Sequence, residues 1–569
     1  MIFKSTHRVI TTLFIFVLSL PLFSCNPSST QVVSLSSSTA QTGFLVIAPD
    51  RGYAGNQKVR KAFRSLDKNR NAQLMFATDE RMKPYLIKAL ATLKADGAKT
   101  IIVMPLYLSA SHPQLTHFRT MLKKESNQQV TFARPFGGSY LAVELLVQRI
   151  RDSNIGDNSL IIAGHGVSSK ETSTLMHRDI QRIADQAMED IGDNKIEVVV
   201  WPDGEDRELL EAQNEKAWNW VKNLEDGKKT WQIIPFHMGS NLDGMMNFDS
   251  ELQRSKPKTM VMTEFTDNES EFYALWMQRE ANRYIPVKDA SVGIVFNAHG
   301  SDFHWNQTMR DAVADLSKKI PLEFAFSMAD SDDLSKAVKR LEDRGVGVIV
   351  IVRVFGMRTS FRHSVERLIG LDIDAPELCL MDEGSRHYGP PPKRLRTTAL
   401  VVTEGGLADS PFFAKALFDR ANKLSSNHGK DTVIVVAHGK GRDEANQQWL
   451  KVLESLSKQI NEMSDGKFKA VKYQTWREDW KDKRGTRIDS VKQMVIDANK
   501  DGGTALIIPA RTTGEGPTKR FLGDMKYKAG KGFAPHPLFP KWIEDQKDRG
   551  LETLKQTRHV WYPALGAEK

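Results

Sequence analysis

Three histidines stand at the ends of short apolar stretches, and a glycine follows each of them. They are His165 in 161–166, His299 in 295–301 and His438 in 435–439. A neutral imidazole is the commonest protein ligand for divalent first-row metals, and it is also a base near neutral pH. One such histidine would more often be a hydrogen-bonded loop residue, but three at equivalent places make metal or proton chemistry an equal alternative.

Further side chains of the ligand type follow other apolar stretches. His112 and His117 come after the apolar stretch 101–105, and His237 comes two residues after Pro235. Glu80 follows the apolar stretch that precedes 101–105 in the chain. Taken singly, each fits an ordinary solvated loop. No cysteine pair, His-x-x-x-His, Walker loop or Gly-x-Ser-x-Gly occurs in the right context, which argues against structural zinc, a bound nucleotide and a serine hydrolase.

The elements around these residues alternate in type. Short apolar runs such as 44–47 and 101–104 are separated by amphipathic stretches of helical length. This alternation predicts βα units around a parallel sheet. Parallel α/β sheets bind ligands at the carboxyl ends of their strands, where loops lead into helices. The histidines are therefore expected at ligand-binding edges.

Two landmarks recur four times along the chain. The first is the strand-end position held by Pro49, His165, His299 and His438, and the second is an apolar strand end at or next to residues 105, 235, 353 and 509. Their separation is short, long, short and long, which predicts a duplicated two-domain unit. We therefore expect an α/β fold of four doubly wound parallel-sheet repeats, flavodoxin- or Rossmann-like, in the order A-B-A-B.

The expected boundaries follow from these landmarks. Repeat A1 is placed at 43–155, B1 at 156–285, A2 at 286–395 and B2 at 396–530, with a C-terminal tail at 531–569. A length of 569 residues agrees with four domains, since a domain commonly holds about 150 residues. The formal net charge of +10 is mild and no stretch concentrates it, so nucleic acid is not an expected partner.

The first 25 residues have the layout of a secretory signal peptide, with a cationic start, an apolar run over 9–23 and Cys25. The end of this run resembles the lipobox of bacterial lipoproteins, in which the cysteine is acylated. Residues 26–42 are rich in Ser and Thr and predict a flexible tether. Asn26 resembles the outer-membrane sorting pattern. We expect a lipid-anchored protein on the periplasmic face of the bacterial outer membrane; an ordinary signal peptide or an uncleaved anchor is the alternative.

The residues around the histidines resemble the class II tetrapyrrole chelatases, the CbiX-like sirohydrochlorin cobalt- and ferrochelatases. Members of that family have a strand ending in Ala-His-Gly-Ser, a middle strand ending near a Glu, and a third strand whose loop carries a second His. The best copies are 298–301 through 353–355 and 76 through 112, and 162–166 resembles the second half of two-domain members. The resemblance covers most of the chain after residue 43.

The resemblance implies a chemistry and a set of residues. A divalent metal, Co, Fe or Ni, would be inserted into a tetrapyrrole such as sirohydrochlorin without ATP. The implied metal ligands are His112, His165, His299 and His438, and these with Glu80 form the implied catalytic set. Arg353 and Arg511 are implied partners of the tetrapyrrole carboxylates, with ordinary surface charge as the alternative for each.

No single repeat holds the complete family pattern. A1 has His112 and Glu80 but Pro49 in place of the first histidine, and B1 has His165 but a second histidine that comes early, at His237. A composite site between an A and a B repeat, for instance His112 with His165, would restore two ligands. Two alternatives stay open: a non-catalytic lipoprotein that binds haem, a corrinoid or a metal, and a structural lipoprotein that reuses the scaffold.

Overall fold

The computed structural model describes residues 42–557 except 155, 157, 167–168, 193–194, 203–206, 225–229, 239–247, 263–268, 286–290, 371–392 and 409. Residues 38–569 form one compact unit. The expected signal peptide, Cys25 and the tether up to residue 41 lie outside the described residues. Within the part of the chain that is described, no helix combines the length and the apolar character needed to cross a membrane.

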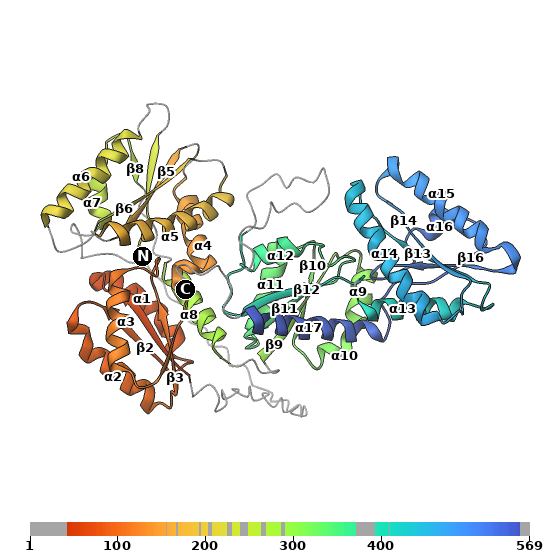
Figure 1. Ribbon diagram of the computed structural model, residues 1–569, viewed down its shortest axis with the longest axis horizontal. Coiled ribbons are helices and arrows are strands. Elements are labelled where there is room, and N and C mark those ends of the chain that lie inside the picture. Colours follow the sequence, from red (N-terminus) through yellow and green to blue (C-terminus); the bar gives the residue numbers. More distant parts are fainter. Residues whose placement is uncertain are drawn as a thin grey trace, which may run out of the picture. The chain divides into compact units, whose positions relative to one another are not determined.

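Four parallel sheets of four strands each form the framework, and all four have the same strand order (Figure 1). The sheet of A1 is β2-β1-β3-β4, built from β1 (Thr42–Pro49), β2 (Ala72–Ala77), β3 (Thr100–Pro105) and β4 (Gln129–Phe132). The sheet of B1 is β6-β5-β7-β8, built from β5 (Ser159–His165), β6 (Ile196–Trp201), β7 (Trp231–Pro235) and β8 (Val261–Met262). The expected α/β fold of four doubly wound repeats is confirmed.

The second half of the chain repeats this arrangement. The sheet of A2 is β10-β9-β11-β12, built from β9 (Val292–Ala298), β10 (Leu322–Phe326), β11 (Val348–Arg353) and β12 (Leu400–Gly405). The sheet of B2 is β14-β13-β15-β16, built from β13 (Thr432–Ala437), β14 (Ala470–Thr475), β15 (Ala505–Pro509) and β16 (Tyr527–Ala529).

Helices connect the strands and cover both faces of the sheets. The helices of A1 and B1 are α1 (Gly52–Asp67), α2 (Lys83–Ala95), α3 (Pro113–Glu125), α4 (Tyr140–Asp152), α5 (Lys170–Glu189), α6 (Arg207–Asn223), α7 (Phe248–Ser255) and α8 (Glu269–Arg283). Those of A2 and B2 are α9 (Phe303–Ala312), α10 (Ala314–Ser317), α11 (Ser331–Glu342), α12 (Arg362–Leu368), α13 (Pro411–Leu424), α14 (Asp443–Ser464), α15 (Lys481–Ala498), α16 (Thr518–Leu522) and α17 (Leu538–Thr557).

The central strands are apolar on both faces because each face meets a separate core. Val46 of β1 packs in the same core as Val59 of α1, whereas its neighbour Ile47 packs in the core that contains Leu86 of α2. Successive side chains of a strand point to opposite faces, so a strand buried on both sides carries an unbroken apolar run. This burial explains why the central strands are the strongest signals in the sequence.

The shared strand order determines where a ligand can be bound. The first and third strands of each repeat are neighbours at the centre of the sheet, and the order reverses between them. The carboxyl ends of strands at such a reversal form the crevice in which doubly wound sheets take their ligands. His165 ends β5 and His237 follows β7, so both lie at this crevice in B1.

The third sheet extends past the boundary expected at residue 395. Strand β12 pairs in parallel with β11, with Leu400 opposite Val348, so it completes the sheet of A2. The sequence analysis placed this strand in B2 because it precedes the B2 landmark. The hydrogen-bond ladder with β11 assigns β12 to A2. The boundary expected at residue 395 therefore comes too early in the chain.

The last helix of each pair packs back onto the A repeat. In the stretch expected to be a tail, α17 buries Phe539, Trp542 and Ile543. A Cβ on its Gly550 would lie 2.7 Å from Val350 of β11, which shows how closely this helix approaches the A2 sheet. Helix α8 at the end of B1 also packs on its A repeat, but on helix α1 and not on the sheet (Figure 1). The residues of α17 are therefore part of the fold.

A buried cluster of ion pairs joins the first pair of repeats to A2. Arg394 donates to Glu144 of α4 at 3.0 Å and also pairs with Asp190, which in turn pairs with Arg367 of α12. All four side chains are at least 95% buried. Removing one partner of such a cluster leaves an uncompensated charge in the interior, which is strongly destabilising.

Candidate functional site

A small cavity between A1 and B1 brings three of the histidines together. Its lining comes from five chain segments and comprises Pro49, Arg51, Tyr107, Leu108, Ser109, His112, His165, Met176, Ile180, His237 and Met238. The cavity holds about 20 Å³. That is room for one water molecule or one metal ion, since a water needs roughly 10–15 Å³ by this measure. We call this site the histidine cavity.

His112 reaches the cavity because the loop after β3 is held tightly. It is the residue before α3, Pro113 begins the helix, and its ring lies 4.9 Å from the ring of Tyr107. The loop is held in turn by Gly137, whose N–H donates to the Tyr107 carbonyl at 2.9 Å. A Cβ at Gly137 would come within 1.9 Å of the Leu108 carbonyl oxygen, so glycine is required for this approach.

His165 accepts a hydrogen bond from A1. Arg51 Nη1 lies 3.0 Å from His165 Nδ1, and because a guanidinium only donates, Nδ1 must be the acceptor. Arg51 follows β1 at the position that Ser301 has after His299 in A2. Sequence analysis missed Arg51 because only the first position of that loop was compared between repeats.

His237 is oriented by a carboxylate. Its Nε2 donates to Asp249 Oδ1 of α7 at 2.8 Å, which is the way in which metal-binding histidines are commonly held. Among the described residues, Nδ1 of His237 and Nδ1 of His112 are buried and have no hydrogen-bond partner. Compared with the family pattern, His237 comes early in its loop, yet it enters the cavity because the site is shared between two repeats.

Burial keeps the imidazoles of His112 and His165 neutral. Loss of solvent, with a smaller contribution from Arg51, lowers the pKa of His112 to about 3. Burial, then Arg51 and the neighbouring histidines, holds the pKa of His165 well below its ordinary value. A neutral imidazole carries one lone pair with which it can bind a metal, and in His165 that lone pair accepts the hydrogen bond from Arg51.

A buried hydroxyl–carboxylate pair lies beside the histidines. Ser109 Oγ donates to Asp179 Oδ2 of α5 at 2.6 Å, and both side chains are 1% exposed. Burial raises the pKa of Asp179, and hydrogen bonding from Ser109 opposes that rise. A carboxylate made more basic in this way accepts a proton more readily than a free one. The sequence holds no evident signal for Asp179, because its role depends on the packing of α5 against A1.

The three imidazoles share the cavity without converging on one point. Among the described residues, the group in which three such side chains bring a ligand atom each within 4.8 Å of one another is His438, Glu478 and Asp479 of B2. A metal in the histidine cavity would therefore contact all three imidazoles only after a local movement.

Two predicted residues lie away from these groups. Glu80 is in a short 3₁₀ helix after β2, its side chain is 77% exposed, and its Oε1 lies 3.5 Å from His117 Nε2. It does not line the cavity, because the helix turns it toward solvent. His299 is exposed and its Nδ1 lies 2.6 Å from the carbonyl oxygen of Gly300.

Arg353 is placed differently from the expectation that it binds a tetrapyrrole carboxylate. Its guanidinium is buried and donates to Thr403 Oγ1 at 3.0 Å and to the carbonyls of Arg358 and Ser360 at 2.8 and 2.7 Å. These bonds hold the loop after β11 against β12. Arg353 is therefore a structural residue of A2, and this prediction is wrong.

In B2 the structure brings His438 and Arg511 together through Glu478. His438 Nε2 lies 2.8 Å from Asp479 Oδ2 and 3.4 Å from Glu478 Oε1, and Arg511 Nη2 lies 3.4 Å from the same Glu478 oxygen. A hollow of about 260 Å³ lies at the other, amino edge of this sheet, between lysines and aspartates such as Lys472 and Asp497. It contains none of the predicted site residues.

These features define a class: tandem doubly wound α/β repeats with histidines at the carboxyl edges of their sheets. Residues 51–153 match the CbiX family model, and this match confirms the expected resemblance of A1 to the class II chelatases. The comparison with curated proteins gave no match.

Solved structures of three proteins are similar to parts of the chain. A multi-domain protein from Deinococcus radiodurans, described as structurally similar to chelatases with two additional novel domains, is 15% identical over 46% of this chain, with a TM-score of 0.32. The chain spans 55% of that protein. A periplasmic ribose ABC transporter protein from Conexibacter woesei is 12% identical, with 44% of this chain and 88% of that one covered and a TM-score of 0.26. Phosphofructokinase from Pichia pastoris is 9% identical, with coverages of 95% and 74% and a TM-score of 0.18.

Proposed function

We propose that the A1–B1 pair acts as a CbiX-like chelatase. It binds a divalent metal in the histidine cavity and transfers this metal into or out of a tetrapyrrole. The observation that carries the proposal is the set of buried histidines in one ion-sized cavity, two of them with pKa values well below the ordinary range. The family match includes the whole loop that supplies His112. Co, Fe and Ni are the candidate metals, because imidazole nitrogens suit all three.

The residues divide the work between metal binding and proton transfer. His112 and His165 act as ligands, since burial makes them poor bases. The lone pair of His165 becomes available only when Arg51 no longer donates to Nδ1. Metal entry into a tetrapyrrole displaces two pyrrole protons, which need an acceptor. Asp179 has a raised pKa and reaches the cavity wall through the Ser109 hydroxyl, so it is a better acceptor than the histidines for one of these protons, and the other passes to water.

Arg51 connects the tetrapyrrole to the metal ligands. Arg51 donates to His165 Nδ1 and occupies that lone pair. A tetrapyrrole such as sirohydrochlorin carries carboxylates, which bind a guanidinium more strongly than a neutral imidazole does. When a carboxylate draws Arg51 away, His165 becomes free to bind the metal, so metal binding follows tetrapyrrole binding.

The volume of the cavity limits how the tetrapyrrole is taken. A pocket for a ligand of drug size holds roughly 300–1,000 Å³, far more than the 20 Å³ found here. The macrocycle is therefore taken at the opening of the cavity, with the metal inside. If no tetrapyrrole is taken, the same histidines still form a metal-binding site, which is the alternative of a non-catalytic metal-binding protein.

The test is a metal-insertion assay. The purified chain is mixed with sirohydrochlorin and Co²⁺, Fe²⁺ or Ni²⁺, and the absorption spectrum is followed against a protein-free blank. His112→Ala and His165→Ala should abolish the acceleration, whereas His299→Ala, an exposed histidine of A2, should keep it. A rate equal to the blank with all three metals refutes the chelatase proposal; a Co²⁺-dependent rise in melting temperature without insertion then supports the binding alternative.

We also propose that Cys25 is acylated and anchors the chain to the periplasmic face of the outer membrane, which would place the metal chemistry in the cell envelope. The support is the sequence layout of residues 1–26. Mass spectrometry of the protein extracted from membranes should find a lipid on Cys25 and no residues before it. A Cys25→Ser variant that stays in the same membrane fraction contradicts the proposal.

A further inference from the structure

Two methionines line the histidine cavity beside the imidazoles. Met176 belongs to α5 and is 3% exposed, and Met238 directly follows His237 and is 7% exposed. A methionine thioether is a neutral and soft ligand, and soft ligands favour Cu⁺ over harder ions such as Co²⁺, Fe²⁺ and Ni²⁺. The function proposed above gives these methionines no part. The lining therefore holds two kinds of donor, imidazole nitrogen and thioether sulfur.

Two imidazole nitrogens of the lining have no hydrogen-bond partner among the described residues. They are the buried Nδ1 atoms of His112 and His237. His237 donates from Nε2 to Asp249, and a proton on its Nδ1 would have no acceptor, so Nδ1 carries the lone pair. His165 differs, because its Nδ1 accepts from Arg51. While Arg51 stays in place, the cavity can thus offer an ion two imidazoles and two thioethers.

The charge of the lining favours a monovalent ion. Arg51 contributes a guanidinium, and none of the described residues that line the cavity is Asp or Glu. Asp179 and Asp249 bind to residues of the lining without being part of it. Repulsion between Arg51 and a bound ion is proportional to the charge of the ion, so Cu⁺ is repelled less than any divalent ion. A divalent ion would also lack an anionic ligand in the lining to offset its burial.

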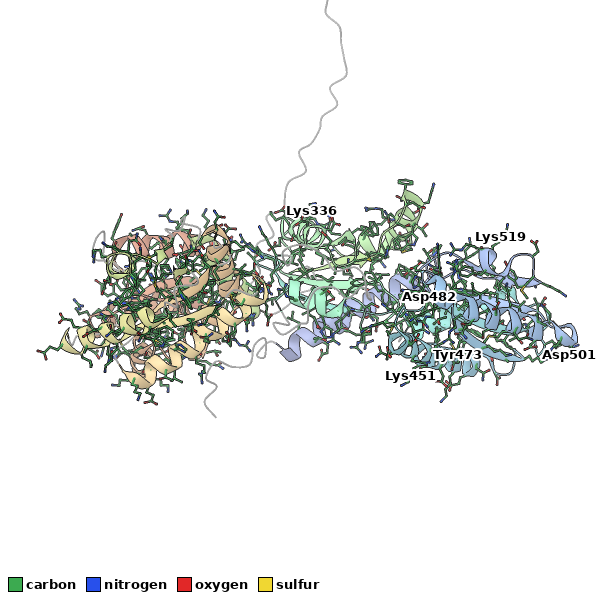
Figure 2. The ribbon with its side chains drawn as sticks, turned by 90° about the horizontal axis from the view of Figure 1, so that it is seen from above. Lys336, Lys451, Tyr473, Asp482, Asp501 and Lys519 are labelled. Atoms are coloured by element: carbon green, nitrogen blue, oxygen red, sulfur yellow. The ribbon has the colours of Figure 1, made fainter. Side chains whose placement is uncertain are left out.

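The hollow at the amino edge of B2 has a different set of charges. Lysines and aspartates line it in pairs, and Lys469 Nζ lies 3.3 Å from Oδ2 of Asp501, which Figure 2 labels. Lys500 Nζ lies 2.8 Å from Asp497 Oδ1 in the same hollow. In the histidine cavity, soft neutral donors take the place of such paired charges, and this difference is what suits it to a soft ion.

We propose that the histidine cavity binds one Cu⁺ ion while Arg51 stays hydrogen-bonded to His165. The ligands are two imidazoles and two thioethers, those of His112, His237, Met176 and Met238. The inference rests on the metal site of the proposed function and adds the methionines, which set the preference for the ion. A divalent metal binds after a tetrapyrrole carboxylate has drawn Arg51 away, whereas Cu⁺ binds before. Cu⁺ therefore competes with the divalent metal and inhibits its insertion.

Competition for copper tests this proposal. The full chain is titrated without oxygen against the coloured complex of Cu⁺ with bicinchoninate, and in parallel with Co²⁺. Wild type should bind Cu⁺ more tightly than Co²⁺ by a factor of about ten or more. The double variant Met176→Leu, Met238→Leu keeps the volume and apolar character of both side chains and should lower the ratio of Cu⁺ to Co²⁺ affinity by a factor of about ten or more. Met309→Leu, which changes a fully buried methionine of α9, is the control and should keep the ratio.

A second measurement needs no variant. X-ray absorption of the Cu⁺-loaded chain should show sulfur as well as nitrogen bound to copper. Copper with nitrogen and oxygen neighbours alone overturns the proposal, and so does a ratio of affinities in the double variant equal to that of wild type. Cu⁺ bound no more tightly than Co²⁺ by wild type overturns it as well.

Metal insertion into sirohydrochlorin is measured on the same samples, so that the two proposals are decided separately. Co²⁺ insertion without preferential Cu⁺ binding overturns the copper site and leaves the chelatase proposal standing. Preferential Cu⁺ binding that depends on the methionines, without insertion of any metal, supports the copper site and refutes the chelatase proposal. Where both hold, added Cu⁺ should slow Co²⁺ insertion by wild type.

Discussion

Replacing His112 by asparagine removes a histidine whose charge is suppressed by the fold. The side chain is 8% exposed, and burial with the nearby Arg51 lowers its pKa to about 3. In the unfolded chain the pKa of a histidine is about 6.5. Between these two values the unfolded chain binds a proton at this position and the folded chain does not, so unfolding takes up a proton and the folded state loses stability as the pH falls.

The size of the effect follows from the two pKa values. Each pH unit between them costs about 1.4 kcal/mol, so His112 lowers the free energy of unfolding by about 2 kcal/mol between pH 7 and pH 5. Unfolding at pH 5 takes up about one proton at this residue, and unfolding at pH 8 takes up almost none. The His112→Asn variant should lack both the proton and that part of the pH dependence.

Proton uptake on unfolding is the suitable measurement, because it does not require that the four repeats unfold in one step. Wild type and His112→Asn are unfolded in lightly buffered solution at pH 5 and pH 8, and the protons taken up are titrated. The two proteins should differ by about one proton at pH 5 and by none at pH 8. Equal uptake at pH 5 would show that His112 is already protonated in the folded chain. That result would contradict the proposal that His112 is a neutral metal ligand.

Three further substitutions test other contacts. Arg51→Ala should raise the pKa values of His112 and His165 without restoring the ordinary value, because burial is the larger cause. NMR titration of labelled imidazoles measures this, and unchanged values would show that Arg51 does not act on these two residues. Asp190→Ala should destabilise the chain by about 3–5 kcal/mol, because it leaves Arg394 buried with fewer partners, as thermal unfolding would show; a loss below about 1 kcal/mol contradicts a buried pair. Gly137→Ala should destabilise the folded chain by about 1–3 kcal/mol, because the added Cβ clashes with the backbone. The control Gly347→Ala adds a Cβ that meets no atom within 4 Å, so it should change the stability by less than about 0.5 kcal/mol. Equal effects of the two substitutions would refute the clash.

The fold could be predicted because its signals are local or periodic. An unbroken run such as 44–47 is required wherever a strand is buried on both faces, and such runs mark the first strand of each of the four repeats. The boundary at residue 395 and the tail at 531–569 were misplaced for another reason. Pairing of β12 with β11 and packing of α17 on A2 join segments far apart in the chain, and no local pattern records which partner a strand or helix will have.

The candidate site residues show the same difference between local signals and contacts with distant segments. The histidines were recognised from their positions after strands, but Arg353 was taken for a ligand-binding residue although it is buried against Thr403. Position in a repeat predicts that a residue lies near the sheet edge. It does not predict whether the side chain turns toward the crevice or into the protein, because that depends on neighbours such as β12.

The sequence by itself determined the four α/β repeats, their A-B-A-B order and the strand-end places of His165, His299 and His438, since each follows from apolar periodicity and from repeated spacing. Tertiary structure decided which of these histidines lie close to other histidines or to carboxylates. Packing of A1 against B1 joins His112, His165 and His237 in one buried cavity and lowers the pKa of the first two, and the loop after β14 brings two carboxylates to His438. Burial and neighbouring charge are properties of the assembled chain, and they place one histidine in a buried cavity and leave another as an exposed loop residue.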